Sequence, residues 1–511
     1  MKRNKSDSNI INILIKLKKI IFEPGKSLSE KVYRGGIWVF LLQGTDQTIR
    51  LLRTIVLARL LAPDDFGLMG IALLVLSVLK RFSQTGFSEA LIQKKEASDH
   101  LDTAWTISLF RGVILFCILF IFSPHISLFF ENPKTNSIIR VISFSLLFDG
   151  LRNIAVIYFQ KNLEFKKKFF FQISGTVIDL FVTIPLALIL KTVWALAIGH
   201  IVRSFTQLLL SYRLSQYRPC FEFNLKKAED LFSFGRWIFG SSILVFLITE
   251  GDDFLVAKIL GATSLAFYQM AYKISNFPST QLSLIVNQVT FPAFSKIQGD
   301  LKRIQKAFLN SFGVTSALSI GIAGGIFVLA EDITLVLLGN EWVDIIPVLQ
   351  VLAIWGAIRA LGGNTSPLLK ALNKPNLITY FHLAMVFGLA LIIYPLTVKW
   401  GILGTAIAVA LSNFFIHWFR YPIISNAIGI CSWKIYRLVL IPLMAAFIMV
   451  VVILFAKSSI SFFANSNFYI LMILIFIGLF IYSFVLYIFS KLFNYSGFDI
   501  IRKLGFAYLD Q

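Results

Sequence analysis

Residues 57–72, LARLLAPDDFGLMGIA, recur 199 positions later as residues 256–271, VAKILGATSLAFYQMA, in an alignment that needs no gap. The same offset pairs GGIWVF at 35–40 with FGRWIF at 234–239, so that Trp38 matches Trp237 and Arg59 matches Lys258. A weaker match relates WALAIG at 194–199 to WGILG at 400–404. A chance match between two hydrophobic stretches is the alternative. One offset that covers a helix, a turn and the next helix favours a chain made of two similar halves.

The composition places both halves in a membrane. Of the 511 residues 57% are hydrophobic and 15% are charged, whereas soluble proteins carry about 25% charged residues. Apolar runs of about 20 residues, enough to cross a hydrocarbon core of about 30 Å, recur along the chain. We predict an all-α integral membrane protein with fourteen spans, at 35–60, 66–90, 102–122, 136–160, 168–190, 193–213, 230–257, 264–294, 307–330, 345–369, 376–398, 401–419, 436–456 and 467–490.

The repeat and the spans together predict the domain organisation. Because the repeat starts after an even number of spans, the halves are expected to be parallel, with a pseudo-two-fold axis along the membrane normal and a cavity between them. The expected parts are a basic N-terminal segment (1–34), an N-lobe of six helices (35–227), a C-lobe of six helices (228–422), two further helices (434–490) and a C-terminal tail (491–511).

The distribution of Lys and Arg predicts the orientation. The side that holds both termini and the even-numbered loops carries 31 of them, and the other side carries six. By the positive-inside rule both termini are cytoplasmic. This bias, with attraction to anionic lipids, accounts for the net charge of +21 without a nucleic-acid partner.

The first span contains a polar face, in LLQGTDQTIRLLR at 41–53. Gln43, Asp46, Gln47 and Arg50 follow helical i, i+3, i+4, i+7 spacing, and Arg53 lies at the edge of the same face. A charge in the middle of a bilayer costs about 2.5–3.5 kcal/mol or more, so this face is expected to line a cavity. The alternative is a closed Asp46–Arg50 pair that fastens helices, which leaves Arg53 and the glutamines unexplained.

The seventh span carries the opposite sign. Glu250, Asp252 and Asp253 lie in TEGDDFLVAKILG at 249–261, and Asp252 aligns with Arg53 in the repeat. These acids are candidates for ion coupling by H⁺ or Na⁺, or for gating by pairing with the arginines. A structural latch is the alternative. Eleven basic residues fall within the predicted spans: Arg50, Arg53, Lys80, Arg81, Arg111, Arg140, Arg152, Arg203, Arg236, Lys273 and Arg359.

A basic cavity with apolar walls suits a large amphipathic anion. Arginine forks match phosphate oxygens, and apolar walls tolerate a lipid tail. Glutamine and aromatic side chains suit sugars. A lipid pyrophosphate that carries an oligosaccharide combines these parts.

Two stretches carry a resemblance to a known family. ARLLAPDDFGLMGIALLVLSVLKRFSQTGFSEALIQ at 58–93 and DDFLVAKILGATSLAFYQMAYKISNFP at 252–278 resemble the oligosaccharide (Wzx-like) flippases of the multidrug/oligosaccharidyl-lipid/polysaccharide exporter superfamily. The resemblance implies a MATE-like fold and the flipping of an undecaprenyl-pyrophosphate-linked repeat unit between leaflets by alternating access. It also implies cavity positions for Arg50 or Arg53, for Arg81 and for Lys273. Expected partners are the lipid-linked oligosaccharide, anionic lipids, and polymerase and chain-length proteins of the pathway.

Four alternatives remain open from the sequence. A multidrug or cation antiporter would need a negative cavity, and a lipid II flippase would differ only in cargo. A membrane glycosyltransferase, ligase or polymerase would need a catalytic constellation. The five histidines are scattered and the three cysteines lie far apart, so no metal site, cofactor or nucleophile is predicted. A passive scaffold would not need the polar face.

Overall fold

The computed structural model describes residues 28–84, 86–93, 98–229, 245–297, 299–460, 468–493 and 495. Throughout these residues the regular structure is helical, with no strand, which confirms the expected all-α class. Most of the predicted N-terminal segment, most of the C-terminal tail, and Trp237 lie outside the described residues.

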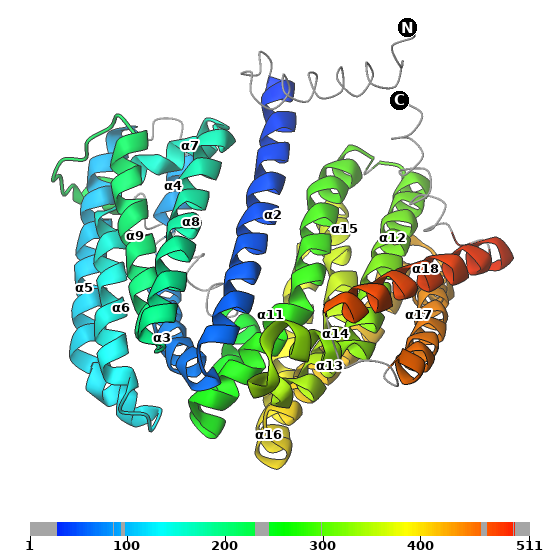
Figure 1. Cartoon of the computed structure of the whole chain (residues 1–511). Helices are drawn as coiled ribbons and strands as arrows, with labels where there is room; N and C mark the ends of the chain where they lie inside the picture. The colour runs from blue at the N-terminus through cyan, green and yellow to red at the C-terminus, as the bar shows by residue number, and fades with distance from the viewer. Residues whose placement is uncertain are drawn as a thin grey trace, which may run out of the picture. The chain divides into compact units, whose positions relative to one another are not determined.

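Contacts between Cα atoms divide the chain into two compact units, which we describe separately (Figure 1). Of the described residues, unit 1 contains those within 1–57, 75–127 and 133–243, and unit 2 contains those within 58–74, 128–132 and 244–511. Two short stretches of the first repeat, 58–74 and 128–132, thus pack with the second half of the chain. The predicted lobes, 35–227 and 228–422, stay a prediction.

Unit 1 is a bundle in which α5, α6, α8 and α9 run side by side (Figure 1). Parts of α2, α3 and α5 belong to it and the remainder to unit 2. The bounds are α2 (Leu28–Leu60), α3 (Pro63–Phe82), α4 (Phe87–Gln93), a 3₁₀ turn (Ser98–His100), α5 (Leu101–Phe129), α6 (Thr135–Leu151), a 3₁₀ turn (Ile154–Ile157), α7 (Tyr158–Lys161), α8 (Phe165–Leu190) and α9 (Trp194–Leu214).

In unit 2, α11, α12, α14 and α16 pack together. Helix α18 crosses α12 and α17 and does not run parallel to them (Figure 1). Its core includes Phe308, Phe312 and Tyr421. The bounds are α11 (Gly251–Lys296), α12 (Leu301–Val328), α13 (Ala330–Ile333), a π-helical turn (Thr334–Leu338), a 3₁₀ turn (Asn340–Ile345), α14 (Ile346–Gly363), α15 (Thr365–Ala371), α16 (Pro375–Ile428), α17 (Ser432–Ile460) and α18 (Phe468–Phe493).

Two glycines bend the longest helices. Gly261 in α11 has φ 84° and ψ −174°, and Gly401 in α16 has φ 61° and ψ −141°. Only glycine adopts such backbone angles readily, so each forms a kink at a defined place. Each kink coincides with a predicted boundary, between 230–257 and 264–294 and between 376–398 and 401–419. In each pair the second helical segment ends later than the predicted span. Helix α16, for example, continues to Ile428 and stops at Gly429, whose backbone is in the left-handed region at φ 68°.

The outer surfaces are apolar, as a membrane protein requires. Large side chains of α17 and α18 are exposed, with Phe455 at 76% and Phe480 at 72%. Among the described residues eight helices are long and apolar enough to cross a membrane, or up to nine if a pair bent by 75°, Thr135–Leu151 with Ile154–Lys161, counts as one span. The protein is therefore a multi-pass membrane protein, and the count of fourteen stays a prediction.

Residues related by the repeat meet within unit 2. Thr263 donates a hydrogen bond to Asp64 at 3.1 Å, and these two residues are 199 positions apart. A Cβ atom on Gly67 would lie 2.0 Å from the carbonyl oxygen of Ala262, so the two chain segments touch at backbone distance. Contact between equivalent positions is what a two-fold axis between repeats produces.

Candidate functional site

The polar face of α2 is attached to α8 in unit 1. The Arg50 Nε atom lies 2.7 Å from Oδ2 of Asp46, and the hydroxyl of Thr176 donates to Oδ1 of Asp46 at 2.5 Å. The Asp46–Arg50 pair that the sequence offered as the alternative is therefore present. The Arg50 side chain nevertheless remains 44% exposed. Gln43 and Gln47 are half-buried on the same helix.

Arg53 has a partner that the sequence did not indicate. Its Nη2 atom lies 2.9 Å from Oδ1 of Asp179 and 3.2 Å from the hydroxyl of Thr183, which itself donates to Asp179 at 2.8 Å. The Asp179 side chain is only 6% exposed. The Nε atom of Arg53 is buried without a hydrogen-bond partner in the described part of the chain. The sequence contained a clue that was not used, because Asp179 is an acid inside a predicted span, at helical spacing from Thr176 and Thr183.

A second charged cluster in unit 1 gathers around Asp149 of α6. Lys80 Nζ lies 2.5 Å from one carboxylate oxygen and Arg152 Nη2 lies 2.6 Å from the other. Arg152 also donates to Gln207 of α9 at 2.9 Å. Arg111 donates to the carbonyl of Lys80 at 3.2 Å. The predicted cation Arg81 lies half-buried in the last turn of α3, while its neighbour Lys80 forms the ion pair with Asp149.

One face of α9 connects the two clusters. His200, Arg203 and Gln207 follow i, i+3, i+7 spacing on this helix. Gln207 accepts a hydrogen bond from Arg152 of one cluster, and a Cβ atom on Gly199 of the same helix would lie 2.6 Å from Oδ1 of Asp179 of the other. Both clusters therefore border α9, and in them arginine and lysine outnumber carboxylates.

The predicted acids lie in unit 2, at the start of α11. Glu250 precedes the helix and is half-buried. Asp252 accepts a hydrogen bond from the Tyr268 hydroxyl at 2.7 Å, and Asp253 accepts one from Gln269 Nε2 at 2.9 Å. Both pairs are sixteen residues apart, a span of about 24 Å on a straight helix. They meet because the Gly261 kink folds the two parts of α11 together. Lys273, further along α11, is exposed.

Unit 2 contains two arginines that sequence reasoning did not assign to the site, of which Arg359 is exposed and Arg420 is buried. Arg359 of α14 donates to Asn276 at 3.1 Å and lies 5.4 Å from the Trp355 ring centroid. Arg420 was counted with a cytoplasmic loop, next to the predicted span 401–419, but it lies inside α16 and is only 7% exposed. Its guanidinium lies 4.7 Å from the Phe381 ring centroid.

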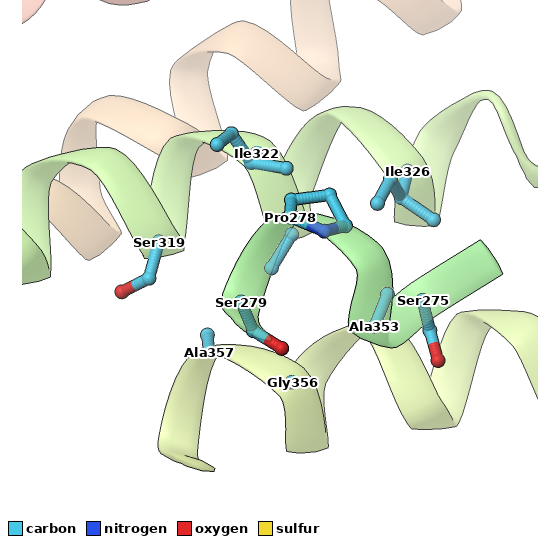
Figure 2. Close-up of a pocket in the computed structure, with 10 residues that line it drawn as sticks. Ser275, Pro278, Ser279, Ser319, Ile322, Ile326, Ala353, Gly356 and Ala357 are labelled. Atoms are coloured by element: carbon cyan, nitrogen blue, oxygen red, sulfur yellow. The ribbon is translucent and has the colours of Figure 1, made fainter. Parts of the chain in front are cut away.

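A small pocket opens between α11, α12 and α14 of unit 2 (Figure 2). It is lined by Ser275, Pro278, Ser279, Ser319, Ile322, Ala323, Ile326, Ala353, Gly356 and Ala357. The Ser319 hydroxyl is buried without a hydrogen-bond partner there. About 10 Å³ is open to the centre of a water molecule, enough for about one water. This pocket is too small for a lipid-linked head group.

Metal binding and disulfide formation were also considered for the described residues. No group of three or more His, Cys, Asp and Glu side chains that could hold a metal ion occurs among them. Cys117, Cys220 and Cys431 are exposed free thiols. The concentrated chemistry of the described chain is thus the charged interior of unit 1 and the hydrogen-bonded acids of α11.

Comparison with known proteins places this arrangement in context. A family model described as "Polysaccharide biosynthesis protein" matches residues 56–347. The Lipopolysaccharide biosynthesis protein WzxC of Escherichia coli (strain K12) is 28% identical over 390 residues, which cover 75% of this chain and 78% of WzxC. The Succinoglycan biosynthesis transport protein ExoT of Rhizobium meliloti (strain 1021) is 26% identical over 320 residues, covering 62% of this chain and 65% of ExoT.

Among solved structures, the lipid II flippase MurJ in an inward closed conformation has a similar fold. The TM-score is 0.72 at 16% sequence identity, and the match covers 89% of this chain and 99% of MurJ. At that identity the likeness concerns the fold alone, and it supports the fold class expected from the sequence.

Proposed function

The chain belongs to the polysaccharide biosynthesis protein family, and from this premise we propose that it is a flippase for lipid-linked oligosaccharides. It moves undecaprenyl-pyrophosphate-linked repeat units of O-antigen, capsule or exopolysaccharide from the inner to the outer leaflet of the bacterial cytoplasmic membrane. Transport proceeds by alternating access, with both termini in the cytoplasm.

The observation that carries this proposal is the charged interior of unit 1. Arg50, Arg53, Lys80 and Arg152 are held in place by only three carboxylates, on α2, α6 and α8. Charges inside a membrane are costly, and those that occur usually mark an ion or substrate pathway. Arginine is well suited to phosphate because its planar fork donates two parallel hydrogen bonds. A pyrophosphate head group is the anion that fits both the charge and the family.

The remaining residues take supporting roles in the proposal. Gln43 and Gln47 contribute amide groups beside Arg50, and Arg81 and Lys273 are further cations for the head group or its sugars. Glu250, Asp252, Asp253 and Asp46 are the groups proposed for ion coupling or gating. Anionic lipids bind the basic cytoplasmic side. Polymerase and chain-length proteins of the same pathway are the proposed protein partners.

The chain acts as a transporter and not as an enzyme. WzxC and ExoT carry names from polysaccharide biosynthesis, and that of ExoT includes transport. These names favour a polysaccharide precursor over a cationic drug as the cargo. Lipid II, another undecaprenyl-pyrophosphate conjugate, is the closest alternative cargo, and the following experiment separates the two.

The test measures where lipid-linked glycans lie in cells without this protein. Spheroplasts are treated with an impermeant glycan-binding probe, and the lipid-linked glycans are extracted and identified. We expect a complete repeat unit to accumulate out of reach of the probe and to become accessible when the intact gene is restored. Accumulated lipid II would identify the alternative cargo. An incomplete glycan would indicate an enzyme, and normal exposure with altered drug sensitivity would indicate an antiporter.

The same assay tests the arginines of α2. Cells that carry Arg50→Ala together with Arg53→Ala should expose far less glycan per inserted protein molecule, at least about ten-fold, because charge-assisted hydrogen bonds are lost. Arg213→Gln, which removes an exposed arginine in the last turn of α9, is the matched control. Undiminished exposure in the double variant would remove these residues from the site.

A further inference from the structure

Arg203 of unit 1 takes part in none of the ion pairs described above. It lies in the middle of α9 and is partly buried. It makes no hydrogen bond or ion pair to the described part of the chain. A Cβ atom on Gly175 of α8 would lie 3.4 Å from Arg203 Cγ, and the next residue, Thr176, donates to Asp46, so Arg203 borders the same interior.

The carboxylates near Arg203 are already engaged. Asp46 accepts from Arg50 and from Thr176. Asp179 accepts from Arg53 and from Thr183. Three guanidinium groups therefore share two carboxylates, and the surplus positive charge is located at Arg203.

Buried side-chain nitrogen atoms near the same face of α9 also lack hydrogen-bond partners. The Nε atoms of Arg53 and Arg152 and the Nε2 atom of His200 are buried without partners in the described residues. Buried polar groups are normally satisfied, and each that is not costs free energy. A surplus cation with several unused donors around it is suited to a ligand that is anionic and rich in acceptor oxygens.

We propose that Arg203 binds the phosphate oxygens of the transported head group and selects pyrophosphate-linked lipids over uncharged lipids. This inference rests on the proposed function and adds a residue to its site. Gly175 of α8 provides room beside it, since a Cβ atom there would lie 3.4 Å from Arg203 Cγ and 3.0 Å from Gln207 Cγ.

The test uses the full-length protein in lipid nanodiscs. Three probes are titrated: undecaprenyl pyrophosphate, undecaprenol, and inorganic pyrophosphate as a competitor. Arg203→Gln should weaken binding of undecaprenyl pyrophosphate by about ten- to hundred-fold, as expected for one charge-assisted hydrogen bond. It should leave undecaprenol binding unchanged. Arg203→Lys should recover part of the loss, because it restores the charge without the fork. Arg213→Gln, on the same helix, should bind like the wild type.

The outcomes separate the inference from the proposed function. If the Arg203→Gln variant binds undecaprenyl pyrophosphate as tightly as the wild type does, the role of Arg203 is overturned and the flippase proposal stays intact. Equal losses for undecaprenol and undecaprenyl pyrophosphate would mean a structural role, and would also overturn it. If the wild type binds undecaprenyl pyrophosphate no better than undecaprenol, both proposals fail. Displacement by inorganic pyrophosphate would assign recognition to the phosphates and not to the lipid tail.

A second inference rests on different residues, all of them in unit 2. Arg59 and Lys258 occupy equivalent positions in the repeat, and each binds the end of another chain segment. Arg59 donates to the carbonyls of Leu335, Val336 and Leu337 at 3.1, 2.5 and 3.1 Å. Lys258 donates to the carbonyl of Phe129, the last residue of α5, at 2.8 Å.

These contacts are reciprocal with respect to the repeat. Arg59, from the first half, binds the end of the π-helical turn that follows α12 and α13 in the second half. Lys258, from the second half, binds the end of α5 in the first half, and its Nζ atom also lies 2.8 Å from Glu131. Carbonyls at the end of a helix lack intrahelical donors, and a nearby cation satisfies them.

We infer that Arg59 and Lys258 form a basic clasp that holds the two repeats together at this end of unit 2. The end is the side predicted to face away from the cytoplasm. Opening it would require both cations to leave their carbonyls, so the clasp stabilises the conformation seen in the structure.

Disulfide cross-linking in membranes tests the clasp in the full chain. In a background with Cys117, Cys220 and Cys431 replaced by Ser, Asp64→Cys and Thr263→Cys report whether the two repeats meet. Cross-linking should be fast with the clasp intact and several-fold slower when Arg59→Gln and Lys258→Gln are combined. Arg59→Lys, which keeps the charge, should remain fast and reports folding. Lys134→Gln, an exposed lysine at the start of α6, is the matched control. An unchanged rate in the double variant, or no cross-linking with the clasp intact, would overturn it.

Discussion

Two groups of aspartates, one in unit 1 and one at the start of α11 in unit 2, have different partners. In unit 1 the carboxylates of Asp46, Asp149 and Asp179 are paired with arginine or lysine. In unit 2, Asp252 and Asp253 accept hydrogen bonds from the neutral groups of Tyr268 and Gln269. A guanidinium or ammonium group in contact with a carboxylate offsets its charge, whereas a neutral donor does not.

The roles proposed above follow this difference. The cations of unit 1 are proposed to bind phosphate, and the acids of α11 are proposed to couple transport to H⁺ or Na⁺. Substitutions at Asp179, Gly261 and Asp253 test this contrast, with expected effects on stability that decrease in that order.

Replacing Asp179 should have the largest effect. Asp179→Ala leaves Arg53 buried without its counter-ion, which costs about 3–5 kcal/mol in comparable buried pairs. Thermal unfolding of the purified protein should therefore shift strongly to lower temperature. Combining Asp179→Leu with Arg53→Met removes both charges and should be less harmful than Asp179→Ala alone. If the single variant is as stable as the wild type, the Arg53–Asp179 pair does not support the fold.

Changing the kink of α11 should have an intermediate effect. Gly261→Ala introduces a side chain at φ 84°, where strain of about 1–3 kcal/mol is expected. Relief of that strain would move Tyr268 and Gln269 away from Asp252 and Asp253. Thermal unfolding measures the stability, and proteoliposome transport measures the coupling. Gly251→Ala, at the first residue of the same helix with open space around it, is the control and should be nearly neutral.

Neutralising Asp253 should have the smallest effect on stability and a clear effect on coupling. Asp253→Asn keeps an acceptor for Gln269, so the free energy of unfolding should change by less than about 1 kcal/mol. Transport in proteoliposomes should lose its response to an imposed H⁺ or Na⁺ gradient. Wild-type transport that ignores both gradients would end the ion-coupling hypothesis. A response that survives in Asp253→Asn would move the coupling to Glu250, Asp252 or Asp46.

Much of the fold could be predicted from local pattern. The lengths of the apolar runs indicate membrane helices because a bilayer has a fixed thickness. The kinks at Gly261 and Gly401 fall at predicted span boundaries. The end of α16 was misplaced, because a polar Arg420 looked like a loop residue and is in fact buried beside Phe381.

The site was predicted in part. Helical spacing identified the polar face of α2, since residues three and four apart share a side of a helix. Asp149, Asp179 and Arg203 were not selected, although all three are charges within predicted spans. Their importance depends on how α6, α8 and α9 are rotated about their axes, and spacing on α2 says nothing about that rotation.

Composition and local order were enough to predict the membrane class, the all-helical fold class, the repeat offset of 199 residues and the family. Which charges meet depends on how the helices pack. Arg53 and Asp179 are 126 positions apart, and Tyr268 reaches Asp252 only across a kink. Ion pairs and hydrogen bonds require contact within about 3 Å, and such contacts between distant residues arise only when helices pack.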